Sequence, residues 1–215
     1  MSLFVALEGA DGSGKSTQAR LLTERLRAEG HEVVATREPG ATPAGAVIRS
    51  LVLGEGDIDR RTEALLVAAD RAEHVAKVVR PALARGAVVV SDRYIPSSLA
   101  YQGMARGLGV EAVERLSAEA TDGLEPDLVV VLDVDQEVAR ARLATAPDRL
   151  EREPAFQEAV RRAYRELAAA RGWHLVDGRA PVEEVAEEVW KLVAPLLPQP
   201  ERVTQPAHDR SSDPF

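Results

Sequence analysis

The chain has 215 residues, no cysteine, a formal net charge of −8 and 45% hydrophobic residues. The length and apolar content suit one sizeable globular domain, and the lack of cysteine excludes disulfides and thiolate metal clusters. The acidic balance argues against a nucleic-acid partner, because dense Lys and Arg patches bind phosphate backbones.

Residues 1–8 are apolar but carry neither a basic start nor a small-residue cleavage pattern. They are typical of a β-strand rather than of a signal peptide. No apolar run approaches the length of a membrane span. We therefore expect a cytoplasmic protein that does not contact a membrane.

Short apolar runs alternate with helical patterns along the chain. Strands are expected at residues 3–7, 33–36, 87–91, 128–132 and 173–176. Helices are expected at residues 16–28, 44–53, 62–84, 98–101, 112–122, 137–143, 154–170 and 182–196. This alternation predicts an α/β fold with a parallel sheet flanked by helices on both faces. Residues 198–215 are rich in Pro, Gln, Asp, Arg and Ser and are predicted to form a disordered tail.

The first expected strand is followed by Gly-Ala-Asp-Gly-Ser-Gly-Lys-Ser, which fits the phosphate-loop pattern G-x-x-x-x-G-K-[ST]. Glycines let several N–H groups point at one anion, and the helix that follows adds the positive end of its dipole. A glycine-rich turn that matches by accident is the alternative, but the strand before and the helix after favour a nucleotide site. The predicted residues of the nucleotide site are Gly9, Ala10, Asp11, Gly12, Ser13, Gly14, Lys15, Ser16 and Thr17.

In such a loop Lys15 reaches the β- and γ-phosphates of ATP, and the Ser16 hydroxyl holds Mg²⁺. Asp92, which follows the third expected strand, is a second candidate ligand for the metal. The chain contains no asparagine, so it lacks both the Asn-Lys-x-Asp element that selects guanine and the asparagine sensor of mechanical ATPases. Small-molecule kinases remain the main class.

An acceptor that is itself a phosphate is largely ionised at neutral pH, because its second pKa is about 6. Such a site needs arginine rather than a catalytic histidine. No histidine here lies in an acid–base motif, and all are expected to be structural or solvated: His31, His74, His174 and His208.

Two arginines directly follow expected strands: Arg37 in Arg-Glu-Pro-Gly and Arg93 in Asp-Arg-Tyr. In a doubly wound sheet the carboxyl ends of these strands lie at the edge that carries the phosphate loop. Surface ion pairs with Glu38 and Asp92 are the alternative, but the placement favours a shared pocket.

Four ordered segments make the chain resemble the bacterial thymidylate kinases over roughly residues 1–197. They are Glu-Gly-Ala-Asp-Gly-Ser-Gly-Lys-Ser-Thr-Gln at 8–18, Thr-Arg-Glu-Pro-Gly at 36–40, Ala-Asp-Arg-Ala at 69–72, and Asp-Arg-Tyr at 92–94 leading into Ser-Leu-Ala-Tyr-Gln-Gly. Asp-Arg-Leu-Glu at 148–151 resembles the end of the lid in this family. The resemblance implies a P-loop NTPase fold with a mobile lid near residues 140–151. It also implies a homodimer and the Mg²⁺-dependent reaction of ATP with dTMP to give ADP and dTDP.

The same resemblance implies roles for single residues. Arg93 is similar to the arginine that grips the acceptor phosphate, and Arg71 to the one that donates to thymine O4. Tyr101 resembles an aromatic ring along the deoxyribose, with a core tyrosine as the alternative. Asp11 resembles an acidic residue near the acceptor phosphate and Mg²⁺, with a turn former as the alternative. The other residues expected around the acceptor are Arg37, Glu38, Pro39, Arg49, Val67, Ser98 and Gln102.

The chain departs from the family pattern at two places. Val67 stands where the family often has an aromatic residue against the base, and valine packs on a pyrimidine but does not stack. The phosphate loop has no arginine, so the catalytic arginine is expected from the lid, where Arg142 and Arg149 are the candidates. The expected catalytic residues are therefore Lys15, Arg93, Asp11 and one of these two.

Two other functions stay open from the sequence. The chain could phosphorylate another nucleoside monophosphate, or it could be a non-catalytic P-loop protein that binds a nucleotide and signals to a partner. An intact Lys15 and Ser16 beside an arginine-lined second site favour the kinase.

Overall fold

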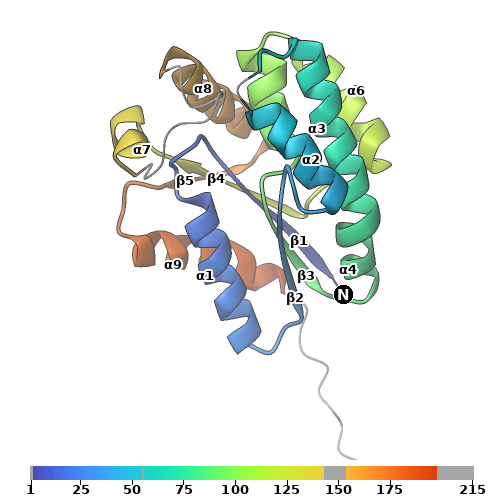
Figure 1. The fold of residues 1–215 in the computed structure, drawn as a ribbon. Helices are drawn as coiled ribbons and strands as arrows, with labels where there is room; N and C mark the ends of the chain where they lie inside the picture. Colours follow the sequence, from blue (N-terminus) through green and yellow to red (C-terminus); the bar gives the residue numbers. More distant parts are fainter. Residues whose placement is uncertain (1, 55, 143–153, 198–215) are drawn as a thin grey trace, which may run out of the picture.

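The computed structural model describes residues 2–54, 56–142 and 154–197. The expected strands form one parallel five-stranded sheet in the order β2-β3-β1-β4-β5 (Figure 1). Their bounds are β1 Leu3–Glu8, β2 Val33–Arg37, β3 Val88–Asp92, β4 Leu128–Asp133 and β5 His174–Asp177. The central strand β1 is buried along its whole length, as a strand covered on both faces requires. The predicted fold class is confirmed.

Helices lie on both faces of this sheet (Figure 1). In chain order they are α1 Lys15–Ala28, α2 Pro43–Leu53, α3 Arg60–His74, η1 Val75–Val79, α4 Arg80–Ala84, α5 Ile95–Ser98, η2 Leu99–Ala105, α6 Val110–Thr121, α7 Gln136–Arg142, α8 Pro154–Arg171, α9 Val182–Val193 and η3 Ala194–Leu196. Residues 143–151 of the expected lid and the whole expected tail lie outside the described residues. No described helix is long and apolar enough to cross a membrane.

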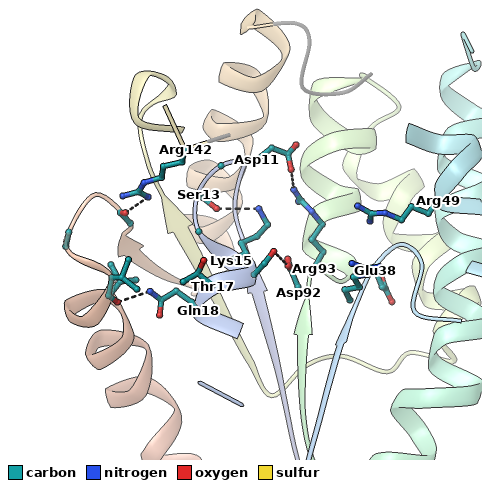
Figure 2. A pocket seen from close by; sticks show the side chains of 18 residues that line it. Asp11, Ser13, Lys15, Thr17, Gln18, Glu38, Arg49, Asp92, Arg93 and Arg142 are labelled. Atoms are coloured by element: carbon teal, nitrogen blue, oxygen red, sulfur yellow. Dashed lines mark hydrogen bonds and ion pairs between the residues drawn. The ribbon is translucent and has the colours of Figure 1, made fainter. Parts of the chain in front are cut away.

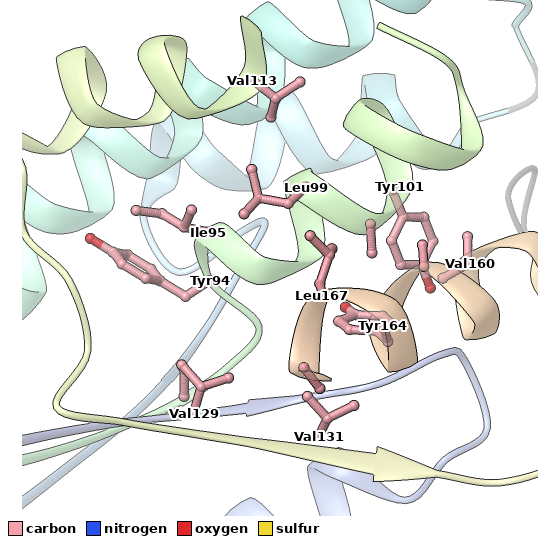
Figure 3. Packing of buried hydrophobic residues seen from close by; sticks show 14 of the residues in the cluster. Tyr94, Ile95, Leu99, Tyr101, Val113, Val129, Val131, Val160, Tyr164 and Leu167 are labelled. Atoms are coloured by element: carbon pink, nitrogen blue, oxygen red, sulfur yellow. The ribbon is translucent and has the colours of Figure 1, made fainter. Parts of the chain in front are cut away.

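The core is divided in two by the alternation of side chains along each strand. Leu3, Val5 and Leu7 point toward α1 and α9, whereas Phe4 and Ala6 point toward η2, α8 and α6. Figure 3 shows the second layer, in which valines of β4 face the apolar side chains of η2 and α8. Burying one such side chain contributes roughly 1.5–3 kcal/mol. The two layers therefore pack both faces of the sheet from whose edge the loops after β1, β2 and β3 begin.

The stretch expected as one helix at 62–84 consists of three joined segments. Between α3 and α4, the segment η1 is a π-helix, in which the Arg80 N–H donates to the carbonyl of Val75, five residues earlier. Pro81, which has no N–H to donate, follows directly. The helix expected at 98–101 likewise continues as the π-helical η2, which carries Tyr101 and Gln102.

Candidate active site

The phosphate loop lies between β1 and α1. Gly9 and Gly12 have φ angles of 135° and 76°, in the left-handed range that favours glycine. A Cβ atom on Gly12 would lie 2.4 Å from the carbonyl oxygen of Ala139, and one on Gly9 would lie 2.4 Å from that of Leu132. The loop is therefore packed so closely against β4 and α7 that these positions require glycine.

Lys15 is the first residue of α1 and is only 6% exposed. Its Nζ donates to the carbonyl oxygen of Ala10 at 2.8 Å and lies 3.4 Å from Ser13 Oγ (Figure 2). Desolvation by burial and the charge of Arg93 lower the pKa of Lys15 to about 8, although nearby carboxylates oppose the shift. The ammonium group is thus held under the loop, poorly solvated until an anion reaches it.

We predict that kcat/KM for ATP falls as the pH rises through about 8, because the free enzyme then loses the Lys15 proton. The protonated form is the active one, since its charge neutralises the phosphates. At saturating ATP, kcat should hold to higher pH, because bound phosphates raise the pKa of the lysine. A pH–rate profile from neutral to alkaline pH, measured for both kcat/KM and kcat, checks the two expectations. A kcat/KM that stays flat across this range would contradict the prediction.

A large cavity opens over the loop and the start of α1. It has a volume of about 550 Å³ and is bounded on its far side by Gly178, Ala180, Val182 and Val185. All of the predicted nucleotide-site residues from Asp11 to Thr17 line it. Gly9 and Ala10 lie beneath the loop instead, where their carbonyl oxygens accept hydrogen bonds from Arg93 and Lys15.

The two predicted metal ligands meet at the floor of this cavity. Ser16 Oγ donates to Asp92 Oδ2 at 2.5 Å, and both residues line the cavity. A hydroxyl and a carboxylate are hard oxygen donors of the kind that Mg²⁺ prefers, together with phosphate oxygens and water. Among the described residues, no group of three or more His, Asp or Glu could hold a metal alone. The site therefore fits a cation that arrives with a nucleotide.

A second, smaller cavity of about 120 Å³ adjoins the first. Its lining contains every predicted acceptor residue except Arg37: Glu38, Pro39, Arg49, Val67, Arg71, Arg93, Ser98, Tyr101 and Gln102, with Asp11 beside them. Arg37 is exposed and lines the larger cavity. Val52, Leu53 and Ser97 complete the wall of the smaller cavity and were not expected from the sequence.

Arg93 follows β3 with a left-handed backbone, at φ 76°. Its Nη2 pairs with Asp11 and lies 3.1 Å from the hydroxyl oxygen of Tyr101, while its Nη1 donates to the carbonyl oxygen of Gly9 at 3.2 Å. The carboxylate that it meets is thus Asp11, and not the neighbouring Asp92 of the surface-pair alternative. Arg93 lies across the boundary of the two cavities, because it lines both.

Asp11 is an ionised partner for this arginine. Burial raises the pKa of Asp11, but Arg93 and Lys15, with hydrogen bonds from Tyr101 and Gln157, lower it to about 2. Gln157, on α8, donates to Asp11 Oδ2 at 3.2 Å. Its contact was not expected, because no local motif surrounds it in the sequence.

Glu8, at the end of β1, is fully buried behind Arg93. It accepts hydrogen bonds from the Tyr94 N–H at 2.7 Å, from Ser97 Oγ at 2.6 Å and from the Tyr164 hydroxyl at 2.8 Å. Burial raises the pKa of Glu8, although its hydrogen bonds and the charge of Arg93 oppose the shift. Ser97 and Tyr164 in turn contact Arg93 Nη1. In the sequence, a carboxylate at the end of an apolar strand could have marked Glu8 as a site residue, whereas no pattern marks Tyr164.

Arg71, on α3, is 1% exposed and forms part of the wall of the smaller cavity. Its Nε donates to Glu38 Oε2 at 2.8 Å, and its Nη2 donates to Ser98 Oγ at 2.9 Å. Glu38 thus pairs with Arg71 rather than with Arg37. On η2, Gln102 Nε2 donates to Glu63 Oε1 at 2.8 Å, which orients the amide.

Of the two lid arginines, Arg149 lies outside the described residues. Arg142, at the end of α7, donates from Nη1 to the carbonyl oxygen of Gly178 at 2.8 Å. Figure 2 shows it across the loop from Arg93 and Arg49, on the side of the cavity that the smaller cavity does not reach. In this arrangement Arg142 borders only the nucleotide-binding part of the site.

A phosphate loop that shares its edge of a parallel sheet with a second, arginine-lined cavity defines a P-loop kinase of small phosphorylated acceptors. The family model of thymidylate kinase matches residues 7–189. The chain is 55% identical to the thymidylate kinase of Leifsonia xyli subsp. xyli over 87% of this chain and 92% of the relative. It is 48% identical to that of Synechococcus sp., with 91% and 96% covered. The crystal structure of thymidylate kinase from Ehrlichia chaffeensis superposes with a TM-score of 0.75 at 31% identity, covering 89% of this chain and 98% of that one. The chain belongs to the thymidylate kinase family.

Proposed function

We propose that this protein transfers the γ-phosphoryl group of ATP to dTMP, giving ADP and dTDP. The observation that carries the proposal is the junction of the two cavities. Both are lined by Asp11, Glu38, Arg49 and Arg93, so a nucleotide triphosphate in one and a monophosphate in the other meet at shared side chains.

The reaction needs no protein base, because the acceptor phosphate already carries its negative charge near neutral pH. An oxygen of dTMP attacks the γ-phosphorus, the bond from that phosphorus to the β,γ-bridging oxygen breaks, and ADP leaves with the electron pair. Lys15 neutralises the β- and γ-phosphates, and Arg93 holds the acceptor phosphate against repulsion between the two anions. Mg²⁺, held through Ser16 and Asp92, would supply further neutralisation of the phosphate charge. A lid arginine would complete the charge balance.

The polar groups that line the smaller cavity support a pyrimidine as the acceptor base. Gln102 directs its nitrogen at Glu63, so its carbonyl oxygen is the group that would accept from thymine N3–H. Arg71 would donate to thymine O4, Ser98 would contact the same edge, and Val67 would pack on the face of the base. Tyr101, whose hydroxyl donates to Asp11 at 2.8 Å, would lie along the sugar and oppose a 2′-hydroxyl.

The test of this proposal is a panel of acceptors assayed with ATP under identical conditions. We predict that kcat/KM is highest for dTMP and that UMP is used far less, because a 2′-hydroxyl meets the Tyr101 ring. Purine monophosphates should also be poor, since they leave the buried polar groups of Arg71 and Gln102 unpaired. Discrimination against dUMP should be looser, because Val67 does not stack on the base. If UMP or CMP outperformed dTMP, thymidylate would not be the substrate.

We further propose that the protein acts in the cytoplasm as a homodimer and does not bind nucleic acid. Support for a dimer comes from apolar side chains left exposed on the neighbouring helices α2 and α3: Val47, Leu51 and Leu65 are 62%, 51% and 58% exposed. Burying them against a second copy would remove these apolar side chains from water. The mass in solution checks this, and a monomer at assay concentrations would contradict it.

A further inference from the structure

His74, at the C-terminal end of α3, is fully buried, yet both of its ring nitrogens have polar partners. Nδ1 lies 2.7 Å from Glu38 Oε1, and Nε2 lies 2.7 Å from Thr36 Oγ1. Because a carboxylate oxygen can only accept, Nδ1 is the donor of the first bond. The ring therefore ties α3 both to β2, which carries Thr36, and to the loop that follows it.

Glu38 is consequently held at both carboxylate oxygens. Arg71 Nε binds Oε2 at 2.8 Å, one helical turn before His74 binds Oε1. The side chains of Arg71, Glu38 and His74 are 1%, 2% and 0% exposed, so no solvent replaces either bond. The same helix fixes the loop once more, because Asp70 Oδ1 accepts from the Gly40 N–H at 2.9 Å.

These three side chains are not equivalent with respect to the ligand. Arg71 and Glu38 line the smaller cavity, whereas His74 does not. The planar guanidinium of Arg71 is held by Glu38 at Nε and by neutral oxygens at Nη1 and Nη2, which belong to the Ser117 hydroxyl, the Tyr94 carbonyl and the Ser98 hydroxyl. Glu38 is the charged partner in this set, so its bond contributes most to the direction in which the plane faces. A Glu38 carboxylate that lost its second donor could turn about its side-chain bonds and take the guanidinium with it. His74 therefore does not touch the ligand itself, and its route to the ligand runs through Glu38 and Arg71.

We propose that His74 is a positioning residue for base selection, an inference that rests on the proposed function. By holding Glu38, the charged partner of Arg71, it helps to fix the plane of Arg71, and thereby the preference for a pyrimidine that presents an acceptor oxygen at position 4. Thymine presents O4 there, whereas cytosine presents an amino donor that opposes the arginine. The ratio of kcat/KM for dTMP to that for dCMP reports this preference directly.

Two matched variants separate the two bonds of the ring. In His74→Asn the side-chain amide nitrogen takes the place of Nδ1 and can still donate to Glu38. In His74→Gln the longer amide reaches the place of Nε2 and pairs with Thr36 instead. His74→Gln leaves a carboxylate oxygen of Glu38 without its donor, and His74→Asn leaves the Thr36 hydroxyl without its partner. Both should lower the melting temperature, His74→Gln by more, because the bond that it loses is to a charged group. A purely structural role predicts the same selectivity for both.

We expect His74→Gln to lower the ratio of dTMP to dCMP use by about tenfold, mainly through KM for dTMP, as the loss of one bond to a charged group implies. His74→Asn should keep the ratio of the wild type, and KM for ATP should stay unchanged in both. Thr36→Val removes the partner of Nε2 and leaves the bond from Nδ1 to Glu38, so it should also keep the dTMP to dCMP ratio of the wild type. This variant still tests the inference if His74→Gln does not fold.

The inference would be overturned by an unchanged ratio in folded His74→Gln, by equal losses in the Gln and Asn variants, or by a lost ratio in Thr36→Val. The wild type separates this inference from the proposed function. A wild type that does not prefer dTMP over dCMP overturns both. If the wild type prefers dTMP and folded His74→Gln has the same ratio, only the role of His74 is overturned.

Discussion

Replacing Lys15 by alanine should lower kcat by about 10²–10³-fold, the loss typical when one preorganised donor to the developing charge is removed. The ammonium lies at the base of the larger cavity, within 2.8 Å of a loop carbonyl, and no second lysine lines that cavity. Its charge is poorly solvated in the empty protein, which lowers its pKa to about 8, so the variant should not lose thermal stability. Steady-state turnover with dTMP and a thermal melt measure the two effects.

Lys77→Ala is the matched control, because this lysine lies exposed on η1 and lines neither cavity of the site. It should retain the turnover of the wild type. Near-normal turnover in folded Lys15→Ala would mean that the loop does not bind the transferred phosphate.

Arg93→Ala should weaken dTMP binding by about 10–100-fold while changing ATP binding little, the range expected for one lost bond to a charged group. Its guanidinium lies where the two cavities join and is held by Asp11, Tyr101 and the carbonyl of Gly9. Calorimetric titration with each nucleotide separately measures the two affinities. Equal losses for ATP and dTMP would place Arg93 outside the acceptor site.

Arg93→Lys serves as the control for charge. It keeps the positive charge but loses the planar fork that reaches several oxygens at once. We expect an affinity for dTMP between those of the wild type and Arg93→Ala. Binding as weak as in the alanine variant would mean that the fork contributes more than the charge.

The fold and the nucleotide side of the site could be predicted because their signals are local. The phosphate loop is one contiguous motif, and buried parallel strands are continuous apolar runs that end where the arginines begin. The same rule does not say which way a side chain faces. Arg37 is the last residue of β2 and Glu38 follows it, yet Arg37 borders only the larger cavity, whereas Glu38 borders both cavities and pairs with Arg71.

The residues behind the site could not be predicted in this way. Glu8 and Tyr164 bind each other across 156 positions of sequence, and no motif in α8 marks its single tyrosine. The sequence predicts only that His74 is structural or solvated, since its partners come from another part of the fold. Such contacts depend on the position and rotation of each helix on the sheet, which the pattern of apolar residues along the chain does not predict.

The left-handed backbone at Arg93 bears on how the protein can be stabilised. A side chain at such a φ angle costs roughly 1–2 kcal/mol relative to right-handed backbone, and glycine would relieve most of it. Glycine there would also leave the carboxylate of Asp11 without its charged partner, so no net gain in stability is expected from the exchange. Thermostabilising substitutions should therefore be sought in the two apolar layers, and this position should be left untouched.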